Sequence, residues 1–151
     1  MHDNNAASLP LIVADIYELA GRLRDNGEAI ARAVDQTQAR WQVMSAASAD
    51  PRTVPQIARR LGVTRQSVQR IADLLVAESC ATFEANPDHR GSPYLVLTRR
   101  GSSALARLTK AADSYHAEVA RRLAGTDIKA VHRGLRRLLD AVARSTKGEL
   151  P

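Results

Sequence analysis

The sequence predicts a mainly α-helical chain with one small β-hairpin, and three observations lead to this fold class. Apolar residues recur at helical spacing along most of the 151 residues. Residues 81–98 instead have strand composition on both sides of a run of turn formers. Between residues 54 and 76, two helical patterns are separated by Gly62. A chain of this length suits one hydrophobic core, so we treat residues 1–151 as a single domain.

The first part of the chain has the pattern of helices. A continuous apolar stripe runs from Leu9 to about Leu23, with Pro10 in the first turn, where its missing N–H has no partner in any case. We expect Gly27 to bend or interrupt this helix before a second apolar run over residues 29–34. Thr37 can cap a further helix over residues 38–47. The inward side of that helix would carry Trp41, Met44, and Ala46 or Ala47.

Residues 54–76 have the pattern of a helix-turn-helix, after a turn at 49–51 and a very short strand at Thr53-Val54. The first helix carries Ile57, Ala58 and Leu61 one turn apart. Gly62 stands where this helix must end, because a residue there often needs a positive φ. Thr64 can cap the second helix. The buried face of the second helix would carry Val68, Ile71, Ala72, Leu75 and Val76. Two short helices joined by a glycine-containing turn form a helix-turn-helix.

The outer face of the second helix carries groups suited to reading DNA. Its first two turns hold Arg65, Gln66, Ser67, Gln69 and Arg70. Arginine can donate two hydrogen bonds to guanine, glutamine can pair with adenine, and serine can bond to a base or a phosphate. In a helix-turn-helix, this end of the second helix enters the major groove. The alternative is an ordinary solvated helix, but residues 54–72 contain no acid, which favours DNA.

A hairpin follows the helix-turn-helix. Residues 81–85 and 94–98 are rich in β-branched and aromatic residues, and residues 86–93 are dense in turn formers. A hairpin directly after such a helix is a wing, and Arg90 at its tip would lie over the minor groove. A long helix over about 98–123 follows. The last amphipathic helix, residues 128–142, would carry Lys129, Arg133, Arg136 and Arg137 on its outer face.

This order of elements resembles the MarR family of bacterial transcription regulators over nearly the whole chain. Residues 86–90 (NPDHR), followed by 94–98 (YLVLT) and Gly101, match the family's wing, and residues 57–64 with Val68 match its helix-turn-helix. The resemblance implies a winged helix over about 37–100 and dimerisation helices over about 9–34 and 101–146. It also implies a homodimer on a palindromic operator, acting as a repressor that a small ligand or oxidation relieves.

By this resemblance, Arg90 would be the minor-groove arginine and Asp88 the carboxylate that orients it. We therefore expect the DNA-binding residues to be Thr64, Arg65, Gln66, Ser67, Gln69, Arg70 and Arg90. In relatives the ligand pocket lies between the dimerisation helices and the winged helix. That position would bring Tyr17, Trp41 and Tyr115 near it, although all three stand at apolar helix positions that also suit core packing.

Composition supports a polyanionic partner. The net charge is +6 and the isoelectric point about 10.2. Residues 1–51 carry a net charge of −3 and residues 52–100 a net charge of +4, so the basic excess begins at the helix-turn-helix. Only five aromatic residues are present, which is a poor supply for stacking on single strands. The alternative function is a winged helix that binds protein or RNA without reading duplex DNA.

Other classes of function have little support. The chain has a single cysteine, Cys80, so an intrachain disulfide is excluded. Cys80 is either a redox sensor or a small buried hydrophobe. Where the family often has a glycine and then an apolar residue, this chain has Ser79 and Cys80. The four histidines lack metal-ligand spacing, and no phosphate loop or G-x-S-x-G motif is present, so we expect no metal, no cofactor and no enzyme. Without a signal peptide or a run of roughly 18–20 apolar residues, we expect a cytoplasmic protein without membrane contact.

Overall fold

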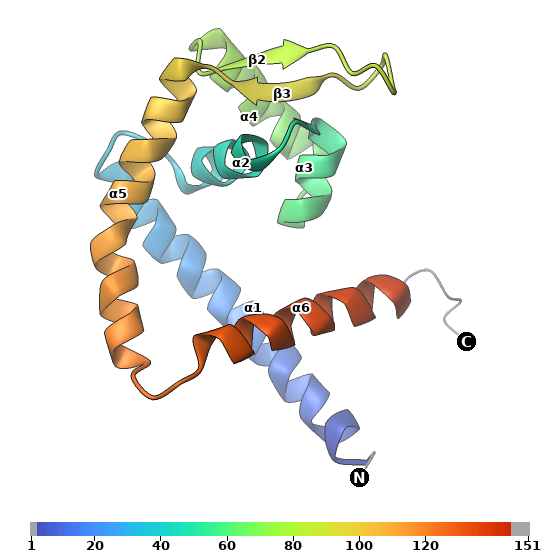
Figure 1. Ribbon diagram of the computed structural model, residues 1–151, viewed down its shortest axis with the longest axis vertical. Helices are drawn as coiled ribbons and strands as arrows, with labels where there is room; N and C mark the ends of the chain where they lie inside the picture. The colour runs from blue at the N-terminus through green and yellow to red at the C-terminus, as the bar shows by residue number, and fades with distance from the viewer. Residues whose placement is uncertain (1–2, 146–151) are drawn as a thin grey trace. The chain divides into compact units, whose positions relative to one another are not determined.

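The computed structural model describes residues 3–145 (Figure 1). They form two compact units, one ending at Ser114 and the other beginning at Tyr115, so helix α5 passes from the first unit into the second. The elements are α1 Asp3–Arg32, α2 Gln38–Ala49, β1 Arg52–Thr53, α3 Val54–Leu61, α4 Arg65–Ala77, β2 Ala81–Glu84, β3 Tyr94–Leu97, α5 Arg99–Arg122 and α6 Ile128–Ser145. The predicted fold class, mainly helical with one small sheet, is confirmed; the extent of the domain stays a prediction.

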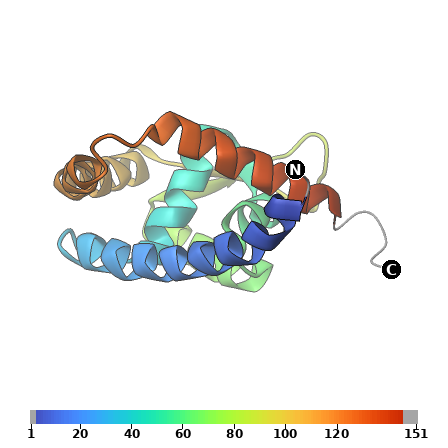
Figure 2. The same ribbon diagram turned by 90° about the horizontal axis from the view of Figure 1, so that it is seen from below.

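Helix α1 is longer and more regular than the sequence suggests. Figure 2 shows it as one continuous helix, so the expected interruption at Gly27 is wrong. Gly27 is buried, and a Cβ there would lie 2.8 Å from Cγ of Gln38. The glycine therefore lets the start of α2 approach α1. Pro10 lies inside the helix and not in its first turn, because the helix begins before Leu9.

Two side chains hold the N-terminus of α2. The Thr37 hydroxyl accepts a hydrogen bond from the backbone N–H of Arg40 at 3.2 Å, which confirms the predicted cap. Glu28 Oε2 accepts a hydrogen bond from the N–H of Gln38 at 2.9 Å. That backbone hydrogen bond, helped by a second from Arg32, holds the pKa of Glu28 below its usual range. The carboxylate of α1 thus binds the positive end of the α2 dipole.

The helix-turn-helix forms as predicted, with one shift at its start. Thr53 and Gln56 make a reciprocal capping box for α3, in which Thr53 N–H donates to Gln56 Oε1 at 2.9 Å. Because Thr53 is the cap, Val54 is helical, and the short strand covers residues 52–53 instead of the expected 53–54. Gly62 ends α3 with φ +66° and ψ 34°, the left-handed conformation that favours glycine.

The sheet is antiparallel with strand order β1-β3-β2. Ala81 pairs with Leu97 and Glu84 with Tyr94, so each strand of the predicted hairpin is one residue shorter than expected. In Figure 1 the loop between β2 and β3 projects beyond the paired strands. The hairpin predicted after α4 is confirmed.

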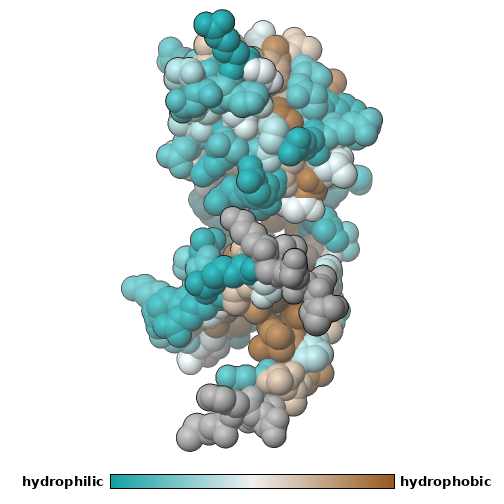
Figure 3. Space-filling model, turned by 90° about the vertical axis from the view of Figure 1, so that its right-hand side faces the viewer, coloured by the Kyte–Doolittle hydropathy of each residue, from teal (hydrophilic) through white to brown (hydrophobic). Residues whose placement is uncertain are grey.

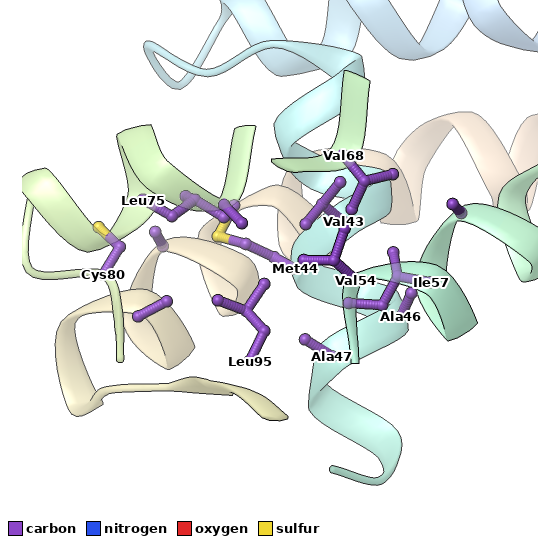
Figure 4. Packing of buried hydrophobic residues seen from close by; sticks show 14 of the residues in the cluster. Val43, Met44, Ala46, Ala47, Val54, Ile57, Val68, Leu75, Cys80 and Leu95 are labelled. Carbon is purple, nitrogen blue, oxygen red and sulfur yellow. The ribbon is translucent and has the colours of Figure 1, made fainter. Parts of the chain in front are cut away.

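The core of the first unit joins the helix-turn-helix to α2, β3 and α5. Figure 4 shows side chains of α2, α3, α4 and β3 pointing toward one another. The largest fully buried side chains are Met44, Ile57, Leu75, Leu95, Leu108, Val43 and Val68. Cys80 belongs to this cluster with 5% of its surface exposed, so it packs as a small hydrophobe. Burial of Val68 and Leu75 fixes which face of α4 points outward.

The junction between the hairpin and α5 explains the Thr98-x-x-Gly101 spacing. The Thr98 hydroxyl donates to the carbonyl of Ser79 at 2.7 Å and accepts from Gly101 N–H at 3.1 Å. Thr98 N–H donates to the carbonyl of Cys80 at 3.0 Å. A Cβ at residue 101 would lie 1.9 Å from that same carbonyl oxygen, so only glycine fits. Ser79 has φ +59°, in the left-handed region that favours glycine over other residues.

Both terminal helices leave apolar side chains open to solvent, and Figure 3 shows hydrophobic surface of this kind in brown. The described part of α6 has no buried residue. Its exposed apolar side chains are Ile128, Val131, Leu135, Leu139 and Val142. Those of α1 are Leu9, Leu11, Ile12, Val13, Tyr17, Leu19 and Leu23.

Candidate nucleic-acid interface

The polar face of α4 is built by its N-terminal cap. The Thr64 hydroxyl accepts from Ser67 N–H at 3.1 Å and donates to Ser67 Oγ at 2.9 Å. With Val68 buried on the opposite side, the polar residues of the first two turns all face solvent. These exposed residues are Thr64, Arg65, Gln66, Ser67, Gln69 and Arg70. The structure therefore brings the six expected residues of this helix onto one exposed surface.

The guanidinium groups on this surface are free of acidic partners. Within residues 3–145, no ion pair involves Arg65, Arg70 or Arg90. The nearby acid on α4 is Asp73, whose carboxylate accepts a hydrogen bond from the Gln69 amide at 2.8 Å. Uncompensated arginines on an exposed helix are available to phosphates or base edges.

An ion pair fixes α4 from its other end. Arg40 of α2 binds Glu78, the C-cap of α4, through two contacts, one of 2.9 Å between Nη1 and Oε1. The hydrogen bond from Arg40 holds the pKa of Glu78 below its usual range, and the same bond raises the pKa of Arg40. Two parallel hydrogen bonds restrict direction as well as distance, so this pair helps to orient α4 on α2. No local pattern predicts this pair, because its members are 38 residues apart in the chain.

The tip of the hairpin presents Arg90 to solvent, as expected. The expected partner is not in place, because no ion pair in the described part of the chain joins Asp88 to Arg90. Asn86 organises this loop instead: its side chain bonds to the backbone of Asp88 and of Ser92. These bonds order the loop on both sides of Arg90 and leave its side chain exposed to solvent. The role of Asp88 stays a prediction.

A surface recess of about 340 Å³ lies between α4 and the hairpin. On the α4 side it is lined by Arg65, Gln66 and Gln69. On the hairpin side it is lined by Phe83 and residues 91–93. Half of the expected α4 residues thus lie beside the hairpin, in one continuous surface.

A second cavity, of about 510 Å³, lies between α1, α2 and α4. Ser67 and Arg70 line it from α4, and Arg24 lines it from α1. The rest of its lining is Ala20, Leu23, Gln38, Ala39, Gln42, Val43, Leu61, Val63, Val68 and Ile71. The polar groups at this position could not be assembled from sequence, because they come from three helices.

The three aromatic residues expected near a ligand pocket do not line this cavity. Tyr17 is 78% exposed on α1. Trp41 is half-buried and packs against the core, which is the alternative considered for it. Tyr115 lies in the second unit, half-buried, with its ring centroid 5.8 Å from that of His116. Their assignment to a ligand pocket stays a prediction.

The described residues also bear on whether the chain has a metal site or a membrane-spanning helix. Among residues 3–145, no three His, Cys, Asp or Glu side chains are grouped as a metal site would require. In the same range, no helix is long and apolar enough to cross a membrane.

The chain is similar to a known protein family and to individual proteins. A model of the MarR family matches residues 34–90, from just before α2 to Arg90. An uncharacterized protein of Mycobacterium tuberculosis is 47% identical over 131 residues, covering 87% of this chain and 92% of its own.

Two solved structures have the same fold. The transcriptional repressor CouR, bound to a 23-mer DNA duplex, matches with a TM-score of 0.65 and 24% identity, over 90% of this chain and 95% of its own. CouR from Rhodococcus jostii, bound to p-coumaroyl-CoA, matches with a TM-score of 0.69 and 16% identity, over 87% of this chain and 91% of its own. At these identities the match shows the fold alone.

Proposed function

Because the chain belongs to the MarR family of transcription regulators, we propose that it reads duplex DNA with α4 and the β2–β3 wing. The observation that carries the proposal is the exposed N-terminal half of α4, where Arg65 and Arg70 have no ion-pair partner among the described residues and Gln66 and Gln69 lie between them. These are the side chains that pair with guanine and adenine in the major groove. The DNA duplex bound to CouR supports the same use of the fold.

The regulator acts as a homodimer in this proposal. The exposed apolar side chains of α1 and α6 named above are 40–78% exposed, and contiguous exposed apolar surface marks a protein interface. A second copy is the natural partner, because a two-fold dimer offers each patch the same patch of its partner. Two copies of α4 would then read the two halves of a palindromic operator in the cytoplasm, where the DNA is.

We further propose that the protein is a repressor relieved by a small ligand in the 510 Å³ cavity between α1, α2 and α4. Cavities of this volume suit drug-sized molecules. Arg24 and Arg70, which have no ion-pair partner among the described residues, lie beside the apolar side chains of Leu23 and Ile71. This lining favours an amphipathic anion, and p-coumaroyl-CoA in CouR supports such an effector. A ligand that engages Arg70 would withdraw it from DNA.

Selection from random sequence tests the DNA-binding proposal. Immobilised protein is incubated with a random duplex pool and, in parallel, with an RNA pool of the same random length, and bound molecules are amplified over several rounds. We expect a duplex motif with two related half-sites. Enrichment of RNA alone would favour the alternative of an RNA-binding winged helix, and no enrichment in either pool would favour a protein-binding one.

A further inference from the structure

The tip of the wing is organised around one buried amide. Asn86 is 8% exposed, although it belongs to the loop between Glu84 and Tyr94 and its neighbours Pro87 and Asp88 are exposed. A buried polar side chain costs free energy unless its hydrogen bonds are made inside the protein. The position of this amide therefore needs a structural reason.

The Asn86 side chain uses both of its ends. Its Nδ2 donates to the carbonyl of Ser92 at 3.0 Å, and its Oδ1 accepts from Asp88 N–H at 3.0 Å. Two backbone bonds continue the pattern: His89 N–H donates to the carbonyl of Asn86 at 3.2 Å, and Ser92 N–H donates to the carbonyl of His89 at 3.1 Å. Arg90 lies between these bonded residues. The four bonds that shape the loop on either side of Arg90 thus involve Asn86 or His89.

We propose that Asn86 is the positioning residue for Arg90, in place of the carboxylate of Asp88. The proposal rests on the proposed DNA-binding function and adds a residue to it. Asn86 does not touch DNA; it holds the loop so that the Arg90 backbone already has the conformation that places its guanidinium in the minor groove. A loop of this length, residues 85–93, would without these bonds have to be ordered on binding, and that ordering entropy would be lost from the affinity.

The geometry favours Asn86 over Asp88 for this role. Asp88 makes no ion pair with Arg90 in the described residues, whereas its backbone N–H is bound by Asn86. A carboxylate next to DNA is also repelled by phosphates, while a neutral amide is not. Asn86 can therefore order the wing without opposing the approach of the duplex.

A double-mutant cycle tests the proposal. Affinity for the duplex selected by the parent protein is measured by fluorescence anisotropy for the parent, Asn86→Ala, Arg90→Ala and the double variant. We expect about a tenfold loss for Arg90→Ala, the factor that one charge-assisted contact of about 1.4 kcal/mol supplies, and a comparable loss for Asn86→Ala. The double variant should bind no more weakly than Arg90→Ala, because Asn86 acts only through that side chain.

Two further variants separate positioning from general support of the fold. Asn86→Asp keeps an acceptor for Asp88 N–H, but it places an oxygen against the carbonyl of Ser92 and adds a negative charge near the phosphates, so it should lose at least as much affinity as Asn86→Ala. Asp88→Ala keeps the backbone N–H that Asn86 binds and should lose less affinity than Asn86→Ala. The proposal would be overturned if Asn86→Ala lowered the affinity for DNA by the same factor in the parent and in Arg90→Ala. It would also be overturned if a second cycle, with Asp88→Ala in place of Asn86→Ala, gave the larger coupling to Arg90.

A measurement on the free protein tests the ordering role of Asn86 independently of DNA binding. Hydrogen exchange of the Asp88 amide should become faster in Asn86→Ala, because the Asn86 Oδ1 that accepts from this N–H is removed, while exchange in α4 should stay unchanged. Unchanged exchange would refute the ordering role even if the protein bound no DNA. If the parent selects no duplex sequence, the proposed function fails instead, and the two failures are thereby distinct.

Discussion

Replacing Gly101 with alanine should destabilise the protein more than any other glycine-to-alanine change in the first unit. The new Cβ would lie 1.9 Å from the carbonyl oxygen of Cys80, whereas real Cβ contacts stay above 3.0 Å, so the backbone must move by more than 1 Å. That carbonyl accepts from Thr98 N–H at 3.0 Å, and the movement strains this bond too. The change therefore acts on the junction between the wing and α5.

The magnitude follows from three contributions. Overpacking against a rigid backbone costs about 1–3 kcal/mol, and a lost buried hydrogen bond adds about 1 kcal/mol. The helix preference of alanine returns about 1 kcal/mol. With the steric term at its upper end, Gly101→Ala should lose about 3 kcal/mol, which lowers Tm by roughly 6–12 °C in a chain of this size.

Thermal and urea unfolding, followed by circular dichroism, measure this loss. Gly21→Ala is the matched control, because Gly21 also lies in a helix interior and outside the apolar stripe of α1. Apart from its chain neighbours and the nearby backbone of its own helix, no atom lies within 4 Å of the place where the new methyl group would stand. The control should gain about 0.5–1 kcal/mol from helix propensity. If Gly101→Ala were as stable as Gly21→Ala, the close approach of α5 to Cys80 would be wrong.

Three further predictions concern assembly, backbone strain and pH. Sedimentation at low micromolar concentration should give about twice the chain mass, and a monomer there would contradict the proposed interface of α1 and α6. Ser79→Gly should stabilise the protein by about 0.5–1 kcal/mol, since relief of the positive φ outweighs the entropy of glycine, and a loss of stability on urea unfolding would contradict this. Glu78→Gln should be less stable than the parent at neutral pH by at most about 1 kcal/mol, because the carboxylate is half exposed. Since the folded pKa of Glu78 is lowered, its contribution is complete above the unfolded value of about 4.3 and is lost as pH falls through the folded value; a difference between Glu78→Gln and parent that persists in acid would contradict the ion pair with Arg40.

Local patterns were sufficient for the helix-turn-helix. The hydrogen bond that the Thr64 hydroxyl accepts from Ser67 N–H and the left-handed conformation of Gly62 each depend on residues within one helical turn, so spacing alone predicted them. The outward direction of the α4 side chains followed from burial of Val68. The hairpin was predictable for the same reason, because its turn formers and its strands are adjacent in sequence.

Contacts between distant segments were not predictable in this way. Gly27 looks like a helix breaker in the sequence, but in the fold a glycine is needed there because Gln38 of another helix packs against it. The need for Gly101 depends on Cys80, which lies 21 residues earlier. Asn86 resembles one turn former among several in the sequence, and its two hydrogen bonds across the loop exist only in the fold. Each of these residues has a role that only the folded chain defines.

The central claim, that α4 reads base sequence, is tested most directly by comparing two arginines. Arg65 lies exposed at the start of α4, and Arg137 lies exposed on α6, a helix that the proposal assigns to dimerisation; neither makes an ion pair in residues 3–145. Affinities of Arg65→Ala and Arg137→Ala are measured on the selected duplex and on a scrambled one across a salt titration. Arg65→Ala should lose roughly 1–3 kcal/mol on the selected duplex and relax preference at particular base pairs, whereas Arg137→Ala should lose little, equally on both duplexes. Equal, sequence-independent losses for the two variants would mean that the protein binds polyanions in general and that α4 is not a recognition helix.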